Sequence, residues 1–363
     1  MKIFHCNHCE HLLFFENTTC LECGRQLAYL PDVALMSSLD PVGDGNWKSP
    51  LPEAEGKIYR LCKNYTDQQV CNWALPASDP QVLCVSCRMT RTIPDLWQPE
   101  NRLAWYRLEV AKRRVIFTLL QLSLPVQNFD ENPQQGLAFE FKSPSPGTQV
   151  VTGHANGVIT INVAEADDVE RERQKKAVHE PYRTVVGHFR HEIGHYYWDR
   201  LIGSCGQTDI FRELFGDERQ DYAAALQAHY ENGPSPDWQA YFVSSYASSH
   251  PWEDWAETWA HYLLMVDALE TAAACGLSLK PSRLDEPSMS RLPASVPSPR
   301  LPFDSLINNW FSLAYALNNF NRGLGVPDAY PFVLSSSAIA KLKYVHDLIQ
   351  AKAEAAMRDS KPA

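Results

Sequence analysis

Three features are missing from this sequence. No apolar stretch approaches the roughly 18 residues that a membrane span needs, so we expect that no segment crosses a bilayer. The first six residues, Met-Lys-Ile-Phe-His-Cys, contain no apolar core of a signal peptide, so we expect a cytoplasmic protein. The sequence also has little positive charge: it contains 33 Lys and Arg residues but 43 Asp and Glu residues, so the formal net charge is −10. This balance argues against general nucleic-acid binding, which needs a basic surface.

What is present is an ordinary globular composition. Hydrophobic residues make up 45% and charged residues 21% of the 363 residues, which excludes wholesale disorder. At about 150 residues per domain, this length allows two or three domains. The chain has ten cysteines, and in a reducing compartment clustered cysteines bind metal more often than they form disulfides.

Four N-terminal cysteines have the spacing of a zinc ribbon. Cys6 and Cys9 form one CxxC pair, and Cys20 and Cys23 form a second. Two thiolates three positions apart in a tight turn can reach one ion, and two such turns complete a closed tetrahedral site. We therefore predict a structural zinc ribbon over residues 1–30. The alternative is a pair of redox motifs, but the βαβ pattern that would surround them is missing.

A second group of cysteines has less regular spacing, and it consists of Cys62, Cys71, Cys84 and Cys87. Only the last two have CxxC spacing, and we predict a second structural zinc site in a module over residues 59–92. The alternative is a pair of buried thiols, Cys62 and Cys71, together with a CxxC pair that has no redox role. Cys205 and Cys275 stand alone, and we expect them to be core thiols.

The N-terminal modules are acidic. Up to Asp95 they contain eight Lys and Arg residues against eleven Asp and Glu residues. Because phosphate contacts need cations, we expect these modules to bind protein or to support the next domain, and not to bind nucleic acid. The sequence leaves the oligomeric state open.

The periodicity predicts an α+β fold, with a mainly helical domain and a small β-sheet over residues 97–358, preceded by the zinc modules. Residues 31–58 contain several prolines and glycines and are interpreted as a linker. Expected strands cover 137–141, 149–152 and 158–163. Expected helices cover 101–121, 181–202, 209–230, 251–275, 306–320 and 337–357, and residues 280–302 are expected to form an exposed loop.

Residues 191–195, His-Glu-Ile-Gly-His, form an HExxH motif. Its histidines lie four positions apart and hence on one face of a helix, where both can bind one metal ion. Glu192 points to the adjacent face, from which it can take a proton from a metal-bound water. Apolar residues flank the motif on both sides, as a buried active-site helix requires. The alternative is that His191 and His195 are surface histidines of an amphipathic helix.

A catalytic zinc site needs a third protein ligand. The extended motif with a third histidine is excluded, because Trp198 and Leu201 occupy the positions of its glycine and its histidine. An acidic residue from a later helix can replace that histidine. Two clusters compete for this role: one is Asp217, Glu218 and Asp221, and the other is Glu253, Asp254 and Glu257 with His250 and His261.

The second cluster fits a buried metal site better. Glu253, Glu257 and His261 lie at i, i+4 and i+8 on one stripe of a helix that is rich in tryptophan and alanine. A buried pair of carboxylates is unfavourable unless a cation or hydrogen bonds compensate it. A metal bound by Glu253 would supply the cation, and Glu257 could accept the free N–H of a ligating histidine. The alternative is that both glutamates lie on a solvated face.

A tyrosine completes a longer pattern, Tyr246-x6-Glu253-x2-Ala256-Glu257, after the HExxH helix. This pattern resembles the catalytic core of gluzincin metallopeptidases, in particular the lethal-factor-type toxin peptidase domain. The resemblance covers about residues 185–265. The whole chain resembles the bacterial "putative zinc-binding metallopeptidase" family with an N-terminal zinc ribbon, which implies a fold and a class of enzyme but no substrate.

The resemblance implies a role for each residue of the pattern. The zinc ligands would be His191, His195 and Glu253. Glu192 would be the general base, and Tyr246 would polarise the carbonyl group of the substrate.

Three functions remain open. The first is a zinc-dependent peptidase that acts on a peptide or protein substrate, with one catalytic and two structural zinc ions. The second is a non-catalytic zinc-ribbon adaptor or regulator, and the third is a metallohydrolase for non-peptide substrates. The intact set of His191, Glu192 and His195 favours catalysis, since a degenerate site could lose Glu192. In a peptidase, we expect strand 158–163 to lie along the cleft and to pair with an extended peptide.

Overall fold

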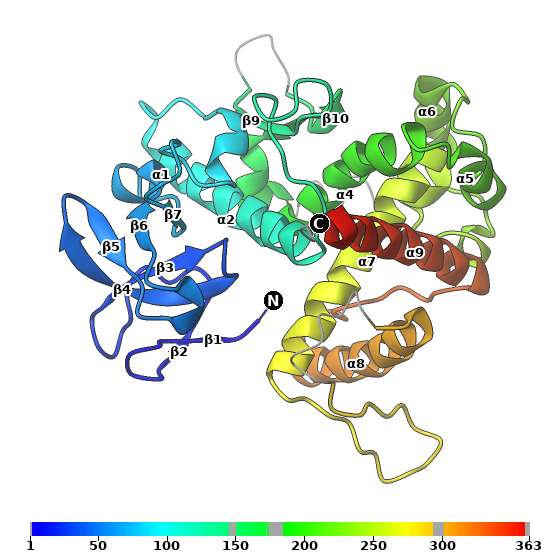
Figure 1. Ribbon diagram of the computed structural model, residues 1–363. Helices are drawn as coiled ribbons and strands as arrows, with labels where there is room; N and C mark the ends of the chain where they lie inside the picture. Colours follow the sequence, from blue (N-terminus) through cyan, green and yellow to red (C-terminus); the bar gives the residue numbers. More distant parts are fainter. Residues whose placement is uncertain (1, 145–149, 172, 174–183, 293–300, 360–363) are drawn as a thin grey trace. The chain divides into compact units, whose positions relative to one another are not determined.

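The computed structural model describes residues 2–144, 150–171, 173, 184–292 and 301–359 (Figure 1). The chain forms two compact units. The N-terminal unit contains Lys2–Gln121 and Pro125–Arg171, and the helical unit contains Leu122–Leu124 and the chain from Glu172 onward. The expected domain boundaries at 1–30, 59–92 and 97–358 stay predictions, because a compact unit is not by itself a domain that folds alone.

The N-terminal unit begins with two antiparallel sheets (Figure 1). The first pairs β1 (Phe4–His5) with β2 (Leu12–Leu13). The second has the order β3-β4-β5-β6-β7. Its strands are β3 (Gln26–Leu30), β4 (Leu35–Gly43), β5 (Asn46–Lys48), β6 (Ile58–Leu61) and β7 (Ala74–Pro76). Short helical segments of the same region are η1 (Pro52–Ala54), α1 (Lys63–Thr66) and η2 (Cys87–Met89).

The interpretation of residues 31–58 as a linker is wrong, because β4 and β5 lie within this range. The buried residues of β4 form a consecutive run, 36–39, which has no polar alternation that could indicate a strand. The turn between β4 and β5 contains Gly43, Asp44 and Gly45, all with positive φ. The glycines that suggested a linker therefore build a turn between two strands.

A third sheet and a long helix complete the N-terminal unit. The sheet has the order β10-β11-β9-β8, and its strands are β8 (Thr90–Thr92), β9 (Ala138–Lys142), β10 (Gly153–Ala155) and β11 (Val158–Asn162). Only the β10–β11 pair is antiparallel, and it turns at Asn156 and Gly157, which both have positive φ. The expected strand 149–152 is wrong in its described part, because the strand begins at Gly153. The η3 turn (Val163–Ala166) packs against helix α2 (Pro99–Gln121).

Aromatic rings join the two cysteine-rich segments to α2. The rings of neighbouring members of this cluster lie 4.8–6.5 Å apart between centroids, and the members are Phe4, Phe15, Tyr29, Trp73 and Phe117. All five side chains are buried. The zinc modules thus share a core with a helix that follows them in the sequence.

The helical unit consists of the later helices (Figure 1). They are α4 (Val185–Trp198), α5 (Thr208–Phe215), α6 (Tyr222–Asn232), α7 (Pro251–Ala274), α8 (Phe303–Gly323) and α9 (Ser336–Asp359). A π-helical turn, η4 (Asp199–Gly203), follows α4, and short 3-10 turns are η5 (Trp238–Ala240) and η6 (Tyr246–Ser249). Helix α7 is central, because α4, α8 and α9 all pack against it. With the sheets of the N-terminal unit, this arrangement confirms the expected α+β class.

Two helix predictions need correction. The expected helix 181–202 begins at Val185, because the Thr184 side chain caps it by accepting the Gly187 N–H; residues 181–183 lie outside the described ranges. The expected helix 209–230 is two helices, α5 and α6. Gly216, with a φ of 100°, ends α5, and the Asp221 side chain caps the start of α6.

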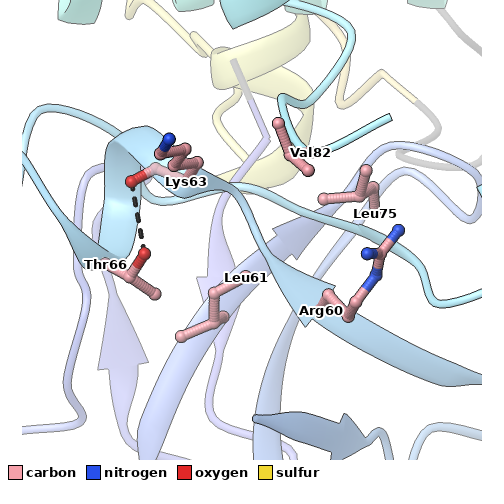
Figure 2. Close-up of a pocket in the computed structure, with 6 residues that line it drawn as sticks. All are labelled: Arg60, Leu61, Lys63, Thr66, Leu75 and Val82. Atoms are coloured by element: carbon pink, nitrogen blue, oxygen red, sulfur yellow. Dashed lines mark hydrogen bonds between the residues drawn. The ribbon is translucent and has the colours of Figure 1, made fainter. Parts of the chain in front are cut away.

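Two further findings concern the single cysteines and a pocket. Cys205 and Cys275 are both exposed, so their assignment as core thiols is wrong. A pocket of about 180 Å³ lies in the N-terminal unit and is lined by Arg60, Leu61, Lys63, Thr66, Leu75 and Val82 (Figure 2). It contains none of the residues of the HExxH helix.

No helix among the described residues is both long and apolar enough to span a membrane.

Candidate active site

Helix α4 carries the HExxH motif into the interior of the helical unit. His191, Glu192 and His195 are all buried. A close crossing of α4 with α7 sets their position. A Cβ atom on Gly194 would lie only 3.0 Å from the Cα atom of Ala256, and the Trp255 indole donates a 2.8 Å hydrogen bond to the Gly194 carbonyl. The glycine of the motif therefore lets the two helix backbones approach closely.

This crossing brings Glu253, in the first turn of α7, to both histidines. Glu253 Oε2 lies 3.0 Å from His191 Nε2, and Glu253 Oε1 lies 3.4 Å from His195 Nε2. One ligand atom from each of the three residues lies within 4.8 Å of the others. Two metal bonds of about 2.1 Å at a tetrahedral angle place their ligand atoms about 3.4 Å apart. The three side chains therefore have the spacing of a zinc site.

The bonding of Glu253 also fits a metal. Its side chain is only 1% exposed, and Oε2 has no hydrogen bond of acceptable geometry within the described part of the chain. Burial would raise the pKa of this carboxyl group, but the charges of His195 and His191 hold the pKa well below its usual range. A buried carboxylate with an unsatisfied oxygen needs a cation, and a metal ion between it and the imidazoles supplies one.

Glu257 lies one turn further along α7, on the other side of His191. Its Oε1 lies 2.8 Å from His191 Nδ1, and its Oε2 accepts a 2.6 Å hydrogen bond from the Ser244 hydroxyl. Burial opposes ionisation, yet the hydrogen bond with His191 lowers the pKa of Glu257 to about 2. The ionised Glu257 thus accepts a hydrogen bond from the Nδ1–H group of His191, and His191 Nε2 is the ring nitrogen that faces Glu253, as in metal-binding histidines.

Glu192 is the neighbouring acid of the motif. Its Oε1 lies 3.2 Å from His188 Nε2, one turn earlier on α4. Its Oε2 is buried and has no hydrogen-bond partner among the residues that the structure describes. Burial would raise the pKa of Glu192, but His188 and the two motif histidines lower it. The carboxylate is therefore ionised and has one oxygen available to accept a proton.

Tyr246 begins the η6 turn, and its ring lies on the His191 side of the site. The ring centroids of Tyr246 and His191 are 5.9 Å apart, and those of Tyr246 and His229 are 6.1 Å apart. This places Tyr246 beside the site. Its action on a substrate carbonyl stays a prediction.

The competing acidic cluster is occupied by other interactions. Glu218 makes two hydrogen bonds to Arg212, and Asp217 makes two to Arg219. Asp221 caps α6. Salt bridges and a helix cap thus account for these three carboxylates.

The remaining candidates of the second cluster have structural partners. His250 caps α7 by accepting the Trp252 N–H. His261 Nδ1 lies 2.7 Å from the Tyr330 hydroxyl. Asp254 lies 2.6 Å from Lys341 Nζ, in a buried ion pair between α7 and α9. Of the expected stripe on α7, only Glu253 and Glu257 contact the HExxH histidines.

Tyr222 is a residue that the sequence did not indicate. Its hydroxyl donates a 2.7 Å hydrogen bond to Glu253 Oε1. Partial burial of the phenol and the adjacent Glu253 carboxylate raise the pKa of Tyr222 above its ordinary value. Tyr222 lies 31 positions before Glu253, outside both spacing patterns, so no local signal could have found it.

Both cysteine groups form compact sulfur clusters. Within each group, the Sγ atoms lie within 4.8 Å of one another, and the groups are Cys6, Cys9, Cys20 and Cys23, and Cys62, Cys71, Cys84 and Cys87. Pairs of sulfurs lie 3.6–3.8 Å apart. Zinc–sulfur bonds of about 2.3 Å in a tetrahedron give a spacing of about 3.8 Å, whereas a disulfide needs about 2.05 Å. The thiols are free of disulfides and have the spacing of zinc ligands.

Comparison with known proteins now gives the class. A family model described as "Putative zinc-binding metallo-peptidase" matches residues 101–348, and a zinc-ribbon domain model matches residues 3–98. The chain belongs to this metallopeptidase family and carries its N-terminal zinc ribbon, as the resemblance in the sequence implied. No solved structure matches it.

Relatives match almost the whole chain. An uncharacterized protein of Mycobacterium tuberculosis (strain H37Rv) is 43% identical over 351 residues, which cover 96% of this chain and 95% of the relative. An uncharacterized protein of Mycobacterium bovis has the same identity and coverage. The zinc-ribbon segment and the peptidase segment therefore occur together in these mycobacterial proteins as well.

Proposed function

We propose that the protein is a zinc-dependent peptidase whose catalytic zinc is held by His191, His195 and Glu253. The observation that carries this proposal is the buried cluster of three ligand atoms within 4.8 Å, with the ionised Glu192 beside it. The two cysteine clusters would hold two further, structural zinc ions. The substrate would be a peptide or a protein.

Each side chain has a role that its contacts support. Zinc at this site would lower the pKa of a bound water from about 15.7 toward 7. Glu192, whose Oε2 is available, would accept the proton and later deliver it to the leaving amine. Tyr246, beside His191, would donate a hydrogen bond to the oxygen of the scissile carbonyl. Glu257 would keep the His191 ring in one orientation and one tautomer.

The test is the substitution Glu192→Gln in the full chain. It removes only proton transfer, so the variant should retain its zinc and its melting temperature while losing hydrolysis by about 10²–10⁴-fold. Products from a peptide library, identified by mass spectrometry, measure hydrolysis, and metal analysis measures zinc. Glu213→Gln, an exposed change on α5, is the matched control and should cleave like the wild type. Cleavage by Glu192→Gln at the wild-type rate would refute the role of Glu192.

A further inference from the structure

Helix α6 reaches the candidate site although none of its side chains is buried. Its first residue is Tyr222, which follows the capping residue Asp221. The Tyr222 residue is 39% exposed, yet its hydroxyl donates a 2.7 Å hydrogen bond to Glu253 Oε1 inside the site. The ring thus runs from the surface of the helical unit to a carboxylate that is 1% exposed.

The start of α7 holds the Tyr222 ring in place. Its centroid lies 5.2 Å from that of the His250 ring and 6.0 Å from that of the Trp252 ring, both in edge-on contacts. His250 Nε2 lies 3.3 Å from the carbonyl oxygen of Gln220, two residues before Tyr222. Trp252 in turn packs on His195, with centroids 4.4 Å apart. The direction of the Tyr222 hydroxyl is therefore fixed from several sides.

The two oxygens of Glu253 have different environments. Oε1 accepts the Tyr222 hydroxyl, whereas Oε2 lies 3.0 Å from His191 Nε2 without a hydrogen bond of acceptable geometry among the described residues. Because a carboxylate can rotate about its terminal bond, one fixed oxygen also fixes the direction of the other. Hydrogen bonds to metal-binding carboxylates raise metal affinity in this way.

We propose that Tyr222 is a positioning residue for Glu253, whose hydroxyl orients the carboxylate toward the metal bound by His191 and His195. This inference rests on the proposed zinc site but not on peptide hydrolysis. The inference gives the two tyrosines of the site different roles: Tyr222 would act on a metal-binding carboxylate, and Tyr246 would act on the substrate.

The same face of α6 also reaches Tyr246. His229 follows Tyr222 by seven residues, or two helical turns, and its ring lies 6.1 Å from the Tyr246 ring. Helix α6 therefore contacts Glu253 through Tyr222 at its start and Tyr246 through His229 near its end. The Tyr222 hydrogen bond to Glu253 and the contact between the His229 and Tyr246 rings thus connect α6 to the site.

The experiment is Tyr222→Phe in the full chain, with zinc affinity measured by competition with a chelator. Loss of the hydroxyl should weaken the most easily removed zinc by about 10–100-fold and leave the zinc of the two cysteine sites unchanged. Tyr246→Phe should keep wild-type zinc affinity and lose kcat. Tyr230→Phe, an exposed change on the same helix, is the control and should change neither.

Three outcomes decide the inference. Wild-type zinc affinity in Tyr222→Phe overturns it. Weakening in Tyr222→Ala but not in Tyr222→Phe also overturns it, because the ring and not the hydroxyl would then matter. Weakened zinc in Tyr222→Phe, with an unchanged circular dichroism spectrum, supports it even if no peptide is cleaved, and in that case only the proposed peptidase function fails.

Discussion

The close crossing of α4 and α7 can be tested with a single methyl group. In Gly194→Ala, the new Cβ would lie 3.0 Å from Ala256 Cα, 3.3 Å from the Ala256 carbonyl oxygen and 3.3 Å from Trp259 Cβ. Two of these atoms belong to the backbone of α7, so they cannot move away without moving that helix. The alanine must therefore separate the helix that carries the histidines from the helix that carries Glu253.

Two effects of opposite sign determine the result. Alanine favours a helix interior over glycine by about 0.5–1 kcal/mol. Overpacking a close contact costs about 1–3 kcal/mol. We expect overpacking to dominate, with a net loss of about 1–2 kcal/mol in the free energy of unfolding. We also expect weaker zinc binding, because metal bonds need ligand atoms placed within about 0.2 Å.

The control is Gly323→Ala at the end of α8. A Cβ atom there meets nothing within 4 Å, and the residue lies in a helix without a positive φ, so alanine should stabilise the protein slightly. Urea unfolding measures both variants, and chelator competition measures their zinc affinity. If Gly194→Ala were as stable as Gly323→Ala and held zinc like the wild type, the close crossing would not define the site.

Three further predictions concern ligands, pH and the N-terminal modules. Glu253→Ala should abolish the easily chelated zinc, Glu257→Ala should weaken it by about 10–100-fold, and Asp217→Ala should leave it in place; metal analysis after dialysis decides between them. Burial lowers the pKa of His261 to about 4, whereas its pKa in the unfolded chain is about 6.5. As the pH falls, the unfolded chain therefore takes up the proton first, and the free energy of unfolding decreases below about pH 6.5. The loss between pH 7.5 and 5 should be about 2 kcal/mol smaller in His261→Gln than in the wild type, and equal losses in urea unfolding would refute this. A chain that starts at Pro94 should aggregate or melt earlier than the full chain, and a monodisperse truncated protein with wild-type melting in a thermal scan would contradict this.

The sequence alone predicts those features of the site that depend on the spacing of residues within one helix. His191 and His195 share a helix face by their spacing alone, and Glu253 and Glu257 do so on a second helix. The structure brings both faces together, since each histidine lies within 3.4 Å of a Glu253 oxygen. The reason for the approach, a glycine that faces Ala256, becomes visible only when the two helices are packed.

Contacts between segments that are distant in the chain could not be predicted from the sequence. Tyr222 reaches Glu253 because the chain breaks at Gly216 and a new helix starts after Asp221, whereas a continuous helix over 209–230 was expected. The strand β4 was missed for a related reason. Its buried serines hide the apolar pattern. Distant segments contact them: the Ser37 hydroxyl hydrogen-bonds to that of Ser49, and the Ser38 backbone N–H donates to the Asn7 side chain.

Helix α2 belongs to the zinc modules by contact, although it follows them in the sequence. Its Glu109 and Lys112 form a buried ion pair at 2.9 Å, and both bond to Thr90 of β8. Removal of the chain before Pro94 would take away Thr90 and leave this pair in contact with water on a face that is otherwise buried. The cost of disturbing a buried pair in this way is typically several kcal/mol.

The charge of the second cysteine cluster gives α2 a stronger tie to it. With zinc bound, four thiolates leave a net charge of −2, and all four cysteines are buried. Arg113 of α2 is 2% exposed and donates to the carbonyl of Val70, the residue before Cys71. Burial opposes the charge of Arg113, yet the nearby Cys71 and Glu109 raise its pKa. Arg113 is permanently charged and therefore offsets part of the negative charge of the cysteine cluster. Loss of either partner would leave a buried charge without compensation. We therefore expect the second zinc module and α2 to fold together.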